Sequence, residues 1–254
     1  MSEYNPNPAA RYGTTAARDR VAVDAGLRAY MLRVYNYMTL GLAITGAVAL
    51  GTFMVAVSTD PATGARALTE IGQLLYASPL KWVVIFAPLA LVFFLSFRID
   101  RLSVGAAQTL FWTYAALVGL SLSVIFLVFT GQSIVRVLFI TAAAFGGLSL
   151  YGYTTKTDLS PLRTFLIMGL IGIIIAFVVN IWLESSMLQW IASVIGVLVF
   201  AGLTAYDTQQ IKEMYYVGDD ATVAGRKSVM GALRLYLDFV NMFMMLLHLF
   251  GNRE

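Results

Sequence analysis

Seven separate apolar blocks, each close to the length of a membrane span, dominate the chain and limit what it can fold into. An α-helix needs about 20 mostly apolar residues to cross the hydrocarbon core of a bilayer. The blocks are continuous, whereas the strands of a membrane β-barrel alternate apolar and polar residues. We therefore expect an all-α, polytopic membrane protein built as a seven-helix bundle. The expected spans are 34–57, 82–97, 104–129, 134–153, 164–183, 188–207 and 229–250.

The overall composition supports this assignment. Hydrophobic residues make up 59% of the 254 and charged residues only 12%, with a mean hydropathy of +0.77. Soluble domains carry about 25% charged residues, so this chain lacks the charge to cover a soluble surface. The connecting segments are short and leave no room for a separate soluble domain. We expect two parts, a polar cytoplasmic segment (1–33) and a transmembrane domain (34–254).

Several functional classes are excluded or disfavoured. The absence of cysteine excludes disulfides and thiolate chemistry, and a single histidine, His248, excludes any site with two histidine ligands. Tyr206-Asp207 resembles one half of an intramembrane aspartyl protease signature, but the Gly-x-Gly-Asp half is missing. We therefore expect no enzyme activity and no cofactor. The net charge of +3 comes from short loops and the N-terminal segment, which indicates a role in topology and no nucleic-acid partner.

The distribution of basic residues predicts the orientation of the chain, because cytoplasmic loops are rich in Lys and Arg. With a cytoplasmic N-terminus, the cytoplasmic side holds Arg11, Arg18, Arg20, Arg28, Arg33, Arg98, Arg101, Lys156, Arg163, Lys212, Arg226 and Lys227. The opposite side holds Arg66, Lys81, Arg136 and Arg253. Seven spans then place the C-terminus outside. If 229–250 were a re-entrant loop, the C-terminus would be cytoplasmic, but its length favours a full span.

Three charged residues fall within or at the end of a span: Asp207, Arg234 and Asp238. A charge at the centre of a membrane helix costs about 2.5–3.5 kcal/mol on insertion scales, so such residues tend to face the bundle interior and mark ion or proton pathways. Asp238 lies about 14 Å into its block, near mid-bilayer. Asp207 lies near the cytoplasmic end of the preceding, antiparallel block. The last block is the least lipid-like and is expected to be the central helix.

The two aspartates offer two kinds of chemistry. Two close carboxylates in a dry site share a proton, which makes a pH sensor. When both are ionised they form an oxygen site for a hard cation such as Ca²⁺, weak or transient because two carboxylates are few. Alternatively, Arg234 and Asp238 form an intrahelical ion pair, and Asp207 pairs with Lys212 or Arg98. Asn241 is a secondary candidate that either links helices or lines a path.

Four motifs, taken in order, resemble the Bax inhibitor-1 (transmembrane Bax inhibitor motif) family, bacterial members above all. The resemblance covers about 30–251. The motifs are Gly119-Leu120-Ser121-Leu122-Ser123, Phe145-Gly146-x-x-Ser149-x-Tyr151-Gly152-Tyr153-Thr154-Thr155-Lys156-x-Asp158-Leu159, Tyr206-Asp207-Thr208-Gln209-x-Ile211-Lys212 and Leu235-Tyr236-Leu237-Asp238-Phe239-x-Asn241-x-Phe243.

The resemblance implies a seven-helix bundle whose pH-sensing di-acid centre is Asp207 and Asp238. It also implies pH-dependent Ca²⁺ leak across a membrane, with an arginine at the end of the second helix latching the first aspartate. Arg98 and Arg101 both fall in that region, and Arg98 is preferred. Two departures are visible: 82–97 contains no acid, and Arg234 stands where the family commonly has a small uncharged residue.

The leading hypothesis is therefore a pH-sensitive ion-leak protein of a bacterial inner membrane, with Ca²⁺ as the expected ion and the lipid bilayer and protons as its other partners. The alternative is a membrane interaction protein that modulates a membrane-anchored protease or a stress or cell-death response. The segment 1–33 is the feature that favours this alternative.

Overall fold

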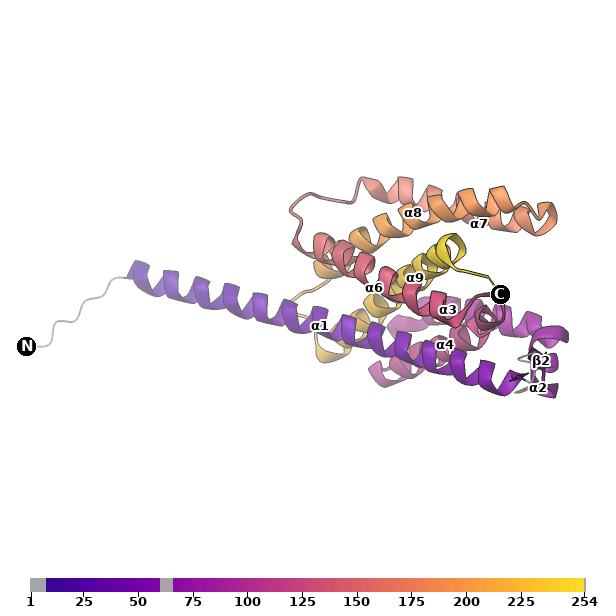
Figure 1. The fold of residues 1–254 in the computed structure, drawn as a ribbon. Helices are drawn as coiled ribbons and strands as arrows, with labels where there is room; N and C mark the ends of the chain where they lie inside the picture. Colours follow the sequence, from indigo (N-terminus) through magenta and orange to yellow (C-terminus); the bar gives the residue numbers. More distant parts are fainter. Residues whose placement is uncertain (1–7, 60–65, 254) are drawn as a thin grey trace, which may run out of the picture.

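The computed structural model describes residues 8–59 and 66–253, and within 8–23 only the helical backbone. In this part of the chain, seven helices are long and apolar enough to cross a bilayer. They run side by side, and a short hairpin lies at one end of the bundle (Figure 1). The all-α, seven-helix membrane fold expected from the sequence is confirmed. The seven spans are Asp24–Ala56, Leu80–Arg101, Val104–Val128, Gly131–Thr154, Leu162–Leu183, Ser186–Glu213 and Ala221–Phe250.

The full element order includes several short pieces between the long helices. It is α1 (Pro8–Ala56), β1 (Val57–Thr59), β2 (Arg66–Leu68), α2 (Glu70–Gly72), a π-helical turn (Gln73–Ala77), α3 (Leu80–Arg98), a 3₁₀ turn (Ile99–Arg101), α4 (Val104–Leu122), α5 (Ile125–Val128), α6 (Gly131–Thr154), α7 (Leu162–Leu183), α8 (Ser186–Glu213) and α9 (Ala221–Phe250). The two strands pair antiparallel, with Val57 opposite Leu68.

Polar N-cap residues explain where four of the long helices begin. A capping side chain accepts a hydrogen bond from a backbone N–H in the first turn, which otherwise has no partner in the helix. The caps are Ser103 for α4, Thr130 for α6, Ser185 for α8 and Asp220 for α9.

Three helix boundaries differ from the expected ones. The boundary expected between residues 33 and 34 lies inside α1, which is continuous from Pro8 to Ala56. Helix α8 continues to Glu213, so Asp207 lies within the helix and not at its end. Helix α9 begins at Ala221, well before 229. Hydropathy marks only the apolar part of a helix, whereas the backbone hydrogen bonding continues into polar residues. The part of the segment 1–33 that precedes Pro8 lies outside the described residues.

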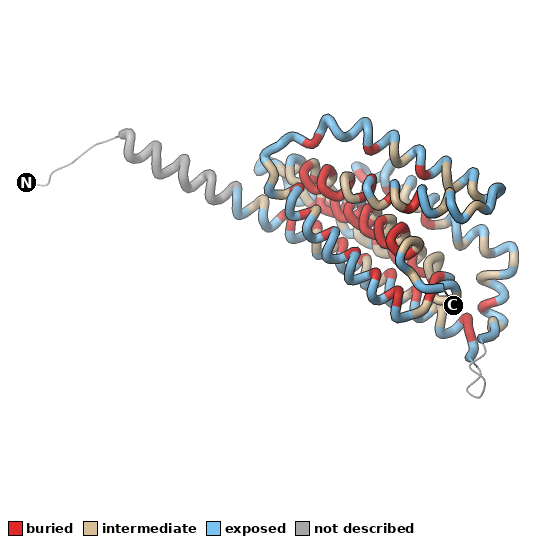
Figure 2. Tube along the Cα trace, turned by 45° about the horizontal axis from the view of Figure 1, so that its top comes forward, coloured by how far each residue is buried: buried red, intermediate tan, exposed pale blue. Residues whose placement is uncertain are grey.

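Helix α9 packs against α1, α4, α6 and α8. Its most apolar window is 67% buried, compared with 11–39% for the other six spans. Figure 2 shows the long run of buried residues that this packing produces. The Tyr236 hydroxyl lies 2.6 Å from the Thr45 hydroxyl, which lies 2.8 Å from the Ala115 carbonyl oxygen. This buried chain links α9 to α1 and α4.

Glycine allows two pairs of helices to approach closely. A Cβ atom at Gly119 would lie 2.5 Å from the Thr45 carbonyl oxygen, and one at Gly152 would lie 2.2 Å from the Ala205 carbonyl oxygen. Both distances are far below van der Waals contact. By contrast, a Cβ atom at Gly146 or Gly147 would meet no heavy atom within 4 Å. Gly119 therefore sets the α1–α4 distance, and Gly152 sets the α6–α8 distance.

Gly152→Ala is expected to lower the free energy of unfolding by about 1–3 kcal/mol, because the added methyl must push α6 away from α8. The measurement is thermal unfolding of the detergent-solubilised protein. Gly147→Ala on the same helix is the matched control and is expected to be neutral or stabilising, since its methyl meets open space. Equal melting temperatures for the two variants would contradict this account of the α6–α8 contact.

Candidate functional site: a buried aspartate pair

The structure brings Asp207 and Asp238 together between α8 and α9. Their carboxyl groups hydrogen-bond to each other. Asp238 is buried, with only 4% of its surface exposed, and its Oδ2 has no hydrogen-bond partner among the described residues. A hydrogen bond between two carboxyl groups requires a proton on one of them, because ionised carboxylates only accept. The arrangement therefore fits a pair that holds one proton.

Arg234 supplies the positive charge that acts on both aspartates. It lies one turn before Asp238, but its side chain is exposed and lines a cavity of about 310 Å³. Two other cations of this cavity have partners elsewhere: Lys227 forms an ion pair of 2.5 Å with Asp219, and the Arg226 Nε donates to the Leu102 carbonyl. Of the cations that line this cavity, Arg234 is therefore the one whose charge acts on Asp207 and Asp238.

The alternative ion pairs expected from the sequence are not formed in the part of the chain that the structure describes. Arg234 makes no ion pair with Asp238, because its long side chain reaches the cavity instead. Lys212 donates from Nζ to the Tyr153 carbonyl oxygen at 2.8 Å and makes no ion pair with Asp207. Asn241 donates to the Leu237 carbonyl of its own helix at 2.8 Å, and among the described residues its amide forms no bond to another helix.

The two candidate latch residues lie where the second span ends. Arg98 is the last residue of α3, and Arg101 ends the 3₁₀ turn that follows. Both side chains are exposed, and among the described residues neither forms an ion pair with Asp207. The latch therefore stays a prediction, and it requires a rearrangement from the conformation seen here.

The residues that follow Asp207 connect the pair to a loop and to α6. Gln209 is buried, and its amide accepts from the Leu159 N–H at 2.8 Å and donates to the Thr157 carbonyl at 2.9 Å. The loop between α6 and α7 is thus fixed to α8, which brings together two of the sequence motifs. In the same loop the Ser160 backbone N–H and hydroxyl bond to Asp158 and lower the pKa of that exposed carboxyl.

Gln209→Leu is expected to destabilise the loop by about 1–3 kcal/mol, because the buried Leu159 N–H loses its acceptor. The measurement is amide hydrogen exchange of the peptide that covers 155–161, which should speed up. Gln210→Leu is the control, because the Gln210 amide bonds to the exposed Glu213 on its own helix and, among the described residues, makes no hydrogen bond to the loop. Unchanged exchange in Gln209→Leu would show that other contacts hold the loop.

A chain of hydroxyl groups reaches the residue beside Asp207. The Tyr35 hydroxyl lies 2.6 Å from the Ser149 hydroxyl, which lies 3.0 Å from the Thr208 hydroxyl. Thr208 donates to the Thr204 carbonyl at 2.7 Å. Sequence patterns indicated no role for these residues, although Ser149, Thr208 and Gln209 lie in the motifs of the family. The chain links α1 and α6 to the helix that carries Asp207.

The donor set can hold a cation only loosely. Among the described residues no group of three or more His, Asp or Glu side chains is placed to hold a metal ion. Ca²⁺ takes 6–8 oxygen ligands, and the pair supplies two carboxyl groups. The positive charge of Arg234 further opposes a resident cation. These residues fit weak, transient contact with a cation better than a permanent metal site.

These features define a polytopic membrane protein with an ionisable pair inside its helix bundle. A family model described as inhibitor of apoptosis-promoting Bax1 matches residues 27–254. The chain belongs to this family, the Bax inhibitor-1 family, as its motifs indicated. It is 47% identical over 233 residues to the inner membrane protein YbhL of Escherichia coli strain K12, covering 91% of this chain and 94% of the relative.

Other relatives are similar over nearly their whole length. The uncharacterized protein RP147 of Rickettsia prowazekii is 46% identical over 243 residues, which is 95% of this chain and 96% of the relative. An uncharacterized protein of Caulobacter vibrioides is 45% identical over 258 residues and covers both chains completely.

Proposed function

We propose that the protein is a pH-sensitive leak for Ca²⁺, controlled by the proton that Asp207 and Asp238 share. The observation that carries this proposal is the hydrogen bond between two carboxyl groups inside the helix bundle, one of them almost completely buried. Such a pair costs energy to keep within a membrane span, and ionisable residues in this position typically serve ion or proton pathways.

The gating step follows from the charge of the pair. While one proton is present, it joins the two carboxyls, and the single negative charge of the pair is held in their hydrogen bond, so Asp207 attracts an arginine only weakly. When the proton leaves, two adjacent negative charges repel, and Asp207 becomes a partner for the latch at Arg98 or Arg101. A latched bundle is the closed state, so flux is expected to fall as pH rises. The charge of the pair thus shifts the equilibrium between the open bundle and the latched, closed bundle.

The ion contacts the pair only in passing. Carboxylate oxygens suit Ca²⁺, but too few are present to hold it, and the charge of Arg234 weakens its binding. Weak, brief binding is what conduction requires, because an ion that binds tightly does not leave.

The test is Ca²⁺ uptake into phosphatidylcholine vesicles that contain the full-length protein, with an entrapped Ca²⁺ indicator, at about pH 6 and about pH 8. Faster uptake at the lower pH is expected, and Asp207→Asn should remove the difference. Protein-free vesicles give the background. Uptake that equals this background at every pH would overturn the proposal, and so would uptake that is indifferent to pH.

For its location we propose the inner membrane of a bacterium, with a cytoplasmic N-terminus and the C-terminus outside. The Lys and Arg distribution supports the orientation, and similarity to the inner membrane protein YbhL of Escherichia coli supports the choice of membrane. Because the chain contains no cysteine, single cysteines are free of background labelling. A cysteine at Lys156 should react with an impermeant reagent only from the cytoplasmic side, and one at Glu184 only from outside.

A further inference from the structure

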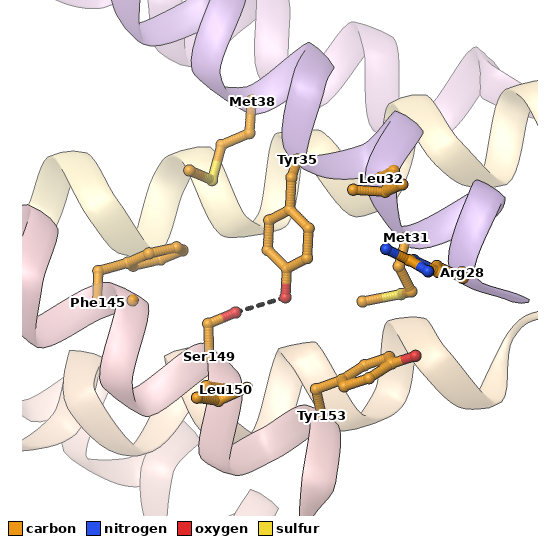
Figure 3. A pocket seen from close by; sticks show the side chains of 10 residues that line it. Arg28, Met31, Leu32, Tyr35, Met38, Phe145, Ser149, Leu150 and Tyr153 are labelled. Atoms are coloured by element: carbon orange, nitrogen blue, oxygen red, sulfur yellow. Dashed lines mark hydrogen bonds between the residues drawn. The ribbon is translucent and has the colours of Figure 1, made fainter.

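A cavity of about 690 Å³ opens between α1 and α6, away from the aspartate pair. On each helix the lining residues, some of them adjacent pairs, recur every three or four positions, so each helix contributes one face. Figure 3 shows these side chains facing one another across the cavity. We call this cavity the α1–α6 groove. It is lined by Arg28, Met31, Leu32, Tyr35, Met38, Phe145, Gly146, Ser149, Leu150 and Tyr153.

The groove opens sideways towards the bilayer. Its residues belong to two membrane spans, Asp24–Ala56 and Gly131–Thr154. Leu32 and Leu150 on its rim are 51% and 63% exposed. Gly146 leaves a gap in the wall of α6, because a Cβ atom there would meet nothing within 4 Å. Acyl chains of the bilayer can enter an apolar groove at this position. Water is a poor occupant, because it would find few hydrogen-bond partners there.

The charged end of the groove indicates a headgroup. Arg28 and Tyr153 lie together at one end, and Met38 and Phe145 lie at the other (Figure 3). Arg28 lies near the start of its span and Tyr153 near the end of its own, so both lie close to the same face of the membrane. The ammonium group of Lys212 lies 5.3 Å from the centre of the Tyr153 ring and adds a second positive charge.

We propose that the α1–α6 groove binds one phospholipid with a net-negative headgroup, its phosphate at Arg28 and one acyl chain along the groove. The faces 28–38 and 145–153 extend for about 12–15 Å at 1.5 Å per residue, which is half the hydrocarbon thickness or less. A single leaflet's acyl chain therefore fits. The bound chain lies against the Tyr35–Ser149 hydrogen bond, which crosses the groove and leads to Thr208. This lipid site does not depend on the proposed ion leak.

The experiment uses the full-length protein in phosphatidylcholine nanodiscs doped with a photoreactive lipid whose acyl chain carries a diazirine. The lipid is phosphatidylglycerol in one sample and phosphatidylcholine in the other, and adducts are mapped by mass spectrometry. Adducts on 28–38 and 145–153 should be about fivefold more abundant with phosphatidylglycerol, because one basic residue near anionic lipid contributes about 1 kcal/mol. Adducts on exposed Phe165 and Met168 of α7 report bulk lipid.

Three variants distinguish a specific site from bulk lipid. Gly146→Leu should abolish the groove adducts by filling the gap, whereas Gly147→Leu, whose side chain also enters open space but does not line the groove, should keep them. Arg28→Gln should reduce the phosphatidylglycerol yield most of the way to that of phosphatidylcholine, because only the charge of Lys212 then remains at this end of the groove. Equal labelling by both lipids in the wild type would mean bulk lipid only and would overturn the proposal. Groove adducts that persist in Gly146→Leu would overturn it as well.

Discussion

Asp238→Asn is expected to remove most of the pH dependence of Ca²⁺ flux between about pH 6 and about pH 8. The asparagine amide donates a hydrogen bond to Asp207 without any titrating proton, so the pair keeps its contact at both pH values. The flux should therefore stay near its low-pH level. The measurement is the ratio of initial uptake rates at the two pH values in reconstituted vesicles.

Asp158→Asn is the matched control for this substitution. Asp158 lies outside the spans, and hydrogen bonds from Ser160 keep the pKa of its carboxyl below the ordinary value. That carboxyl stays ionised throughout the tested range, so its loss should leave the pH dependence intact. If Asp238→Asn retained the full wild-type ratio, the proton would not reside on this pair.

Arg234→Gln is expected to move the midpoint of the flux–pH curve upwards by about one pH unit, which corresponds to a tenfold change in proton affinity. Arg234 is the cation that acts on both aspartates, and removing it makes their doubly ionised form less favourable. A shift of one pH unit is at the low end of the range that a nearby opposite charge produces. We expect this low value because the Arg234 side chain is exposed and its charge is screened by solvent. The measurement is flux at closely spaced pH values.

Arg226→Gln tests whether the effect belongs to Arg234 or to the general charge of the cavity. Arg226 lines the same cavity, but its Nε is engaged by the Leu102 carbonyl. Its substitution should leave the midpoint nearly unchanged. A midpoint that moved equally in both variants would indicate a general surface potential, and a downward shift in Arg234→Gln would contradict the proposed charge relation.

The spans could be predicted because hydropathy reports burial in lipid directly. Their ends could not, because polar residues such as those of 208–213 continue the helical hydrogen bonding beyond the apolar part. The start of α9 depends on the cap at Asp220, a signal that lies outside the apolar block. Helix length was therefore underestimated where polar residues meet the membrane surface.

The contact between Asp207 and Asp238 could be anticipated, because two acids on consecutive antiparallel helices face the bundle interior. The surroundings of the pair could not. A spacing of four residues suggested an Arg234–Asp238 ion pair, but the rotamer of a long side chain depends on the space around it, which here is a cavity. The roles of Gln209 and Thr208 depend on partners 50 to 59 residues away in the sequence, which periodicity does not reveal.

The central claim is that Asp207 and Asp238 share one proton and release it as pH rises. Infrared difference spectroscopy of the reconstituted protein tests this directly, because a protonated carboxyl group has its own C=O stretching band. Between about pH 6 and about pH 8, the wild type should lose one such band, and Asp238→Asn should show no band that changes with pH. A wild-type spectrum without a pH-dependent carboxyl band, or a band that persists unchanged in Asp238→Asn, would contradict the claim.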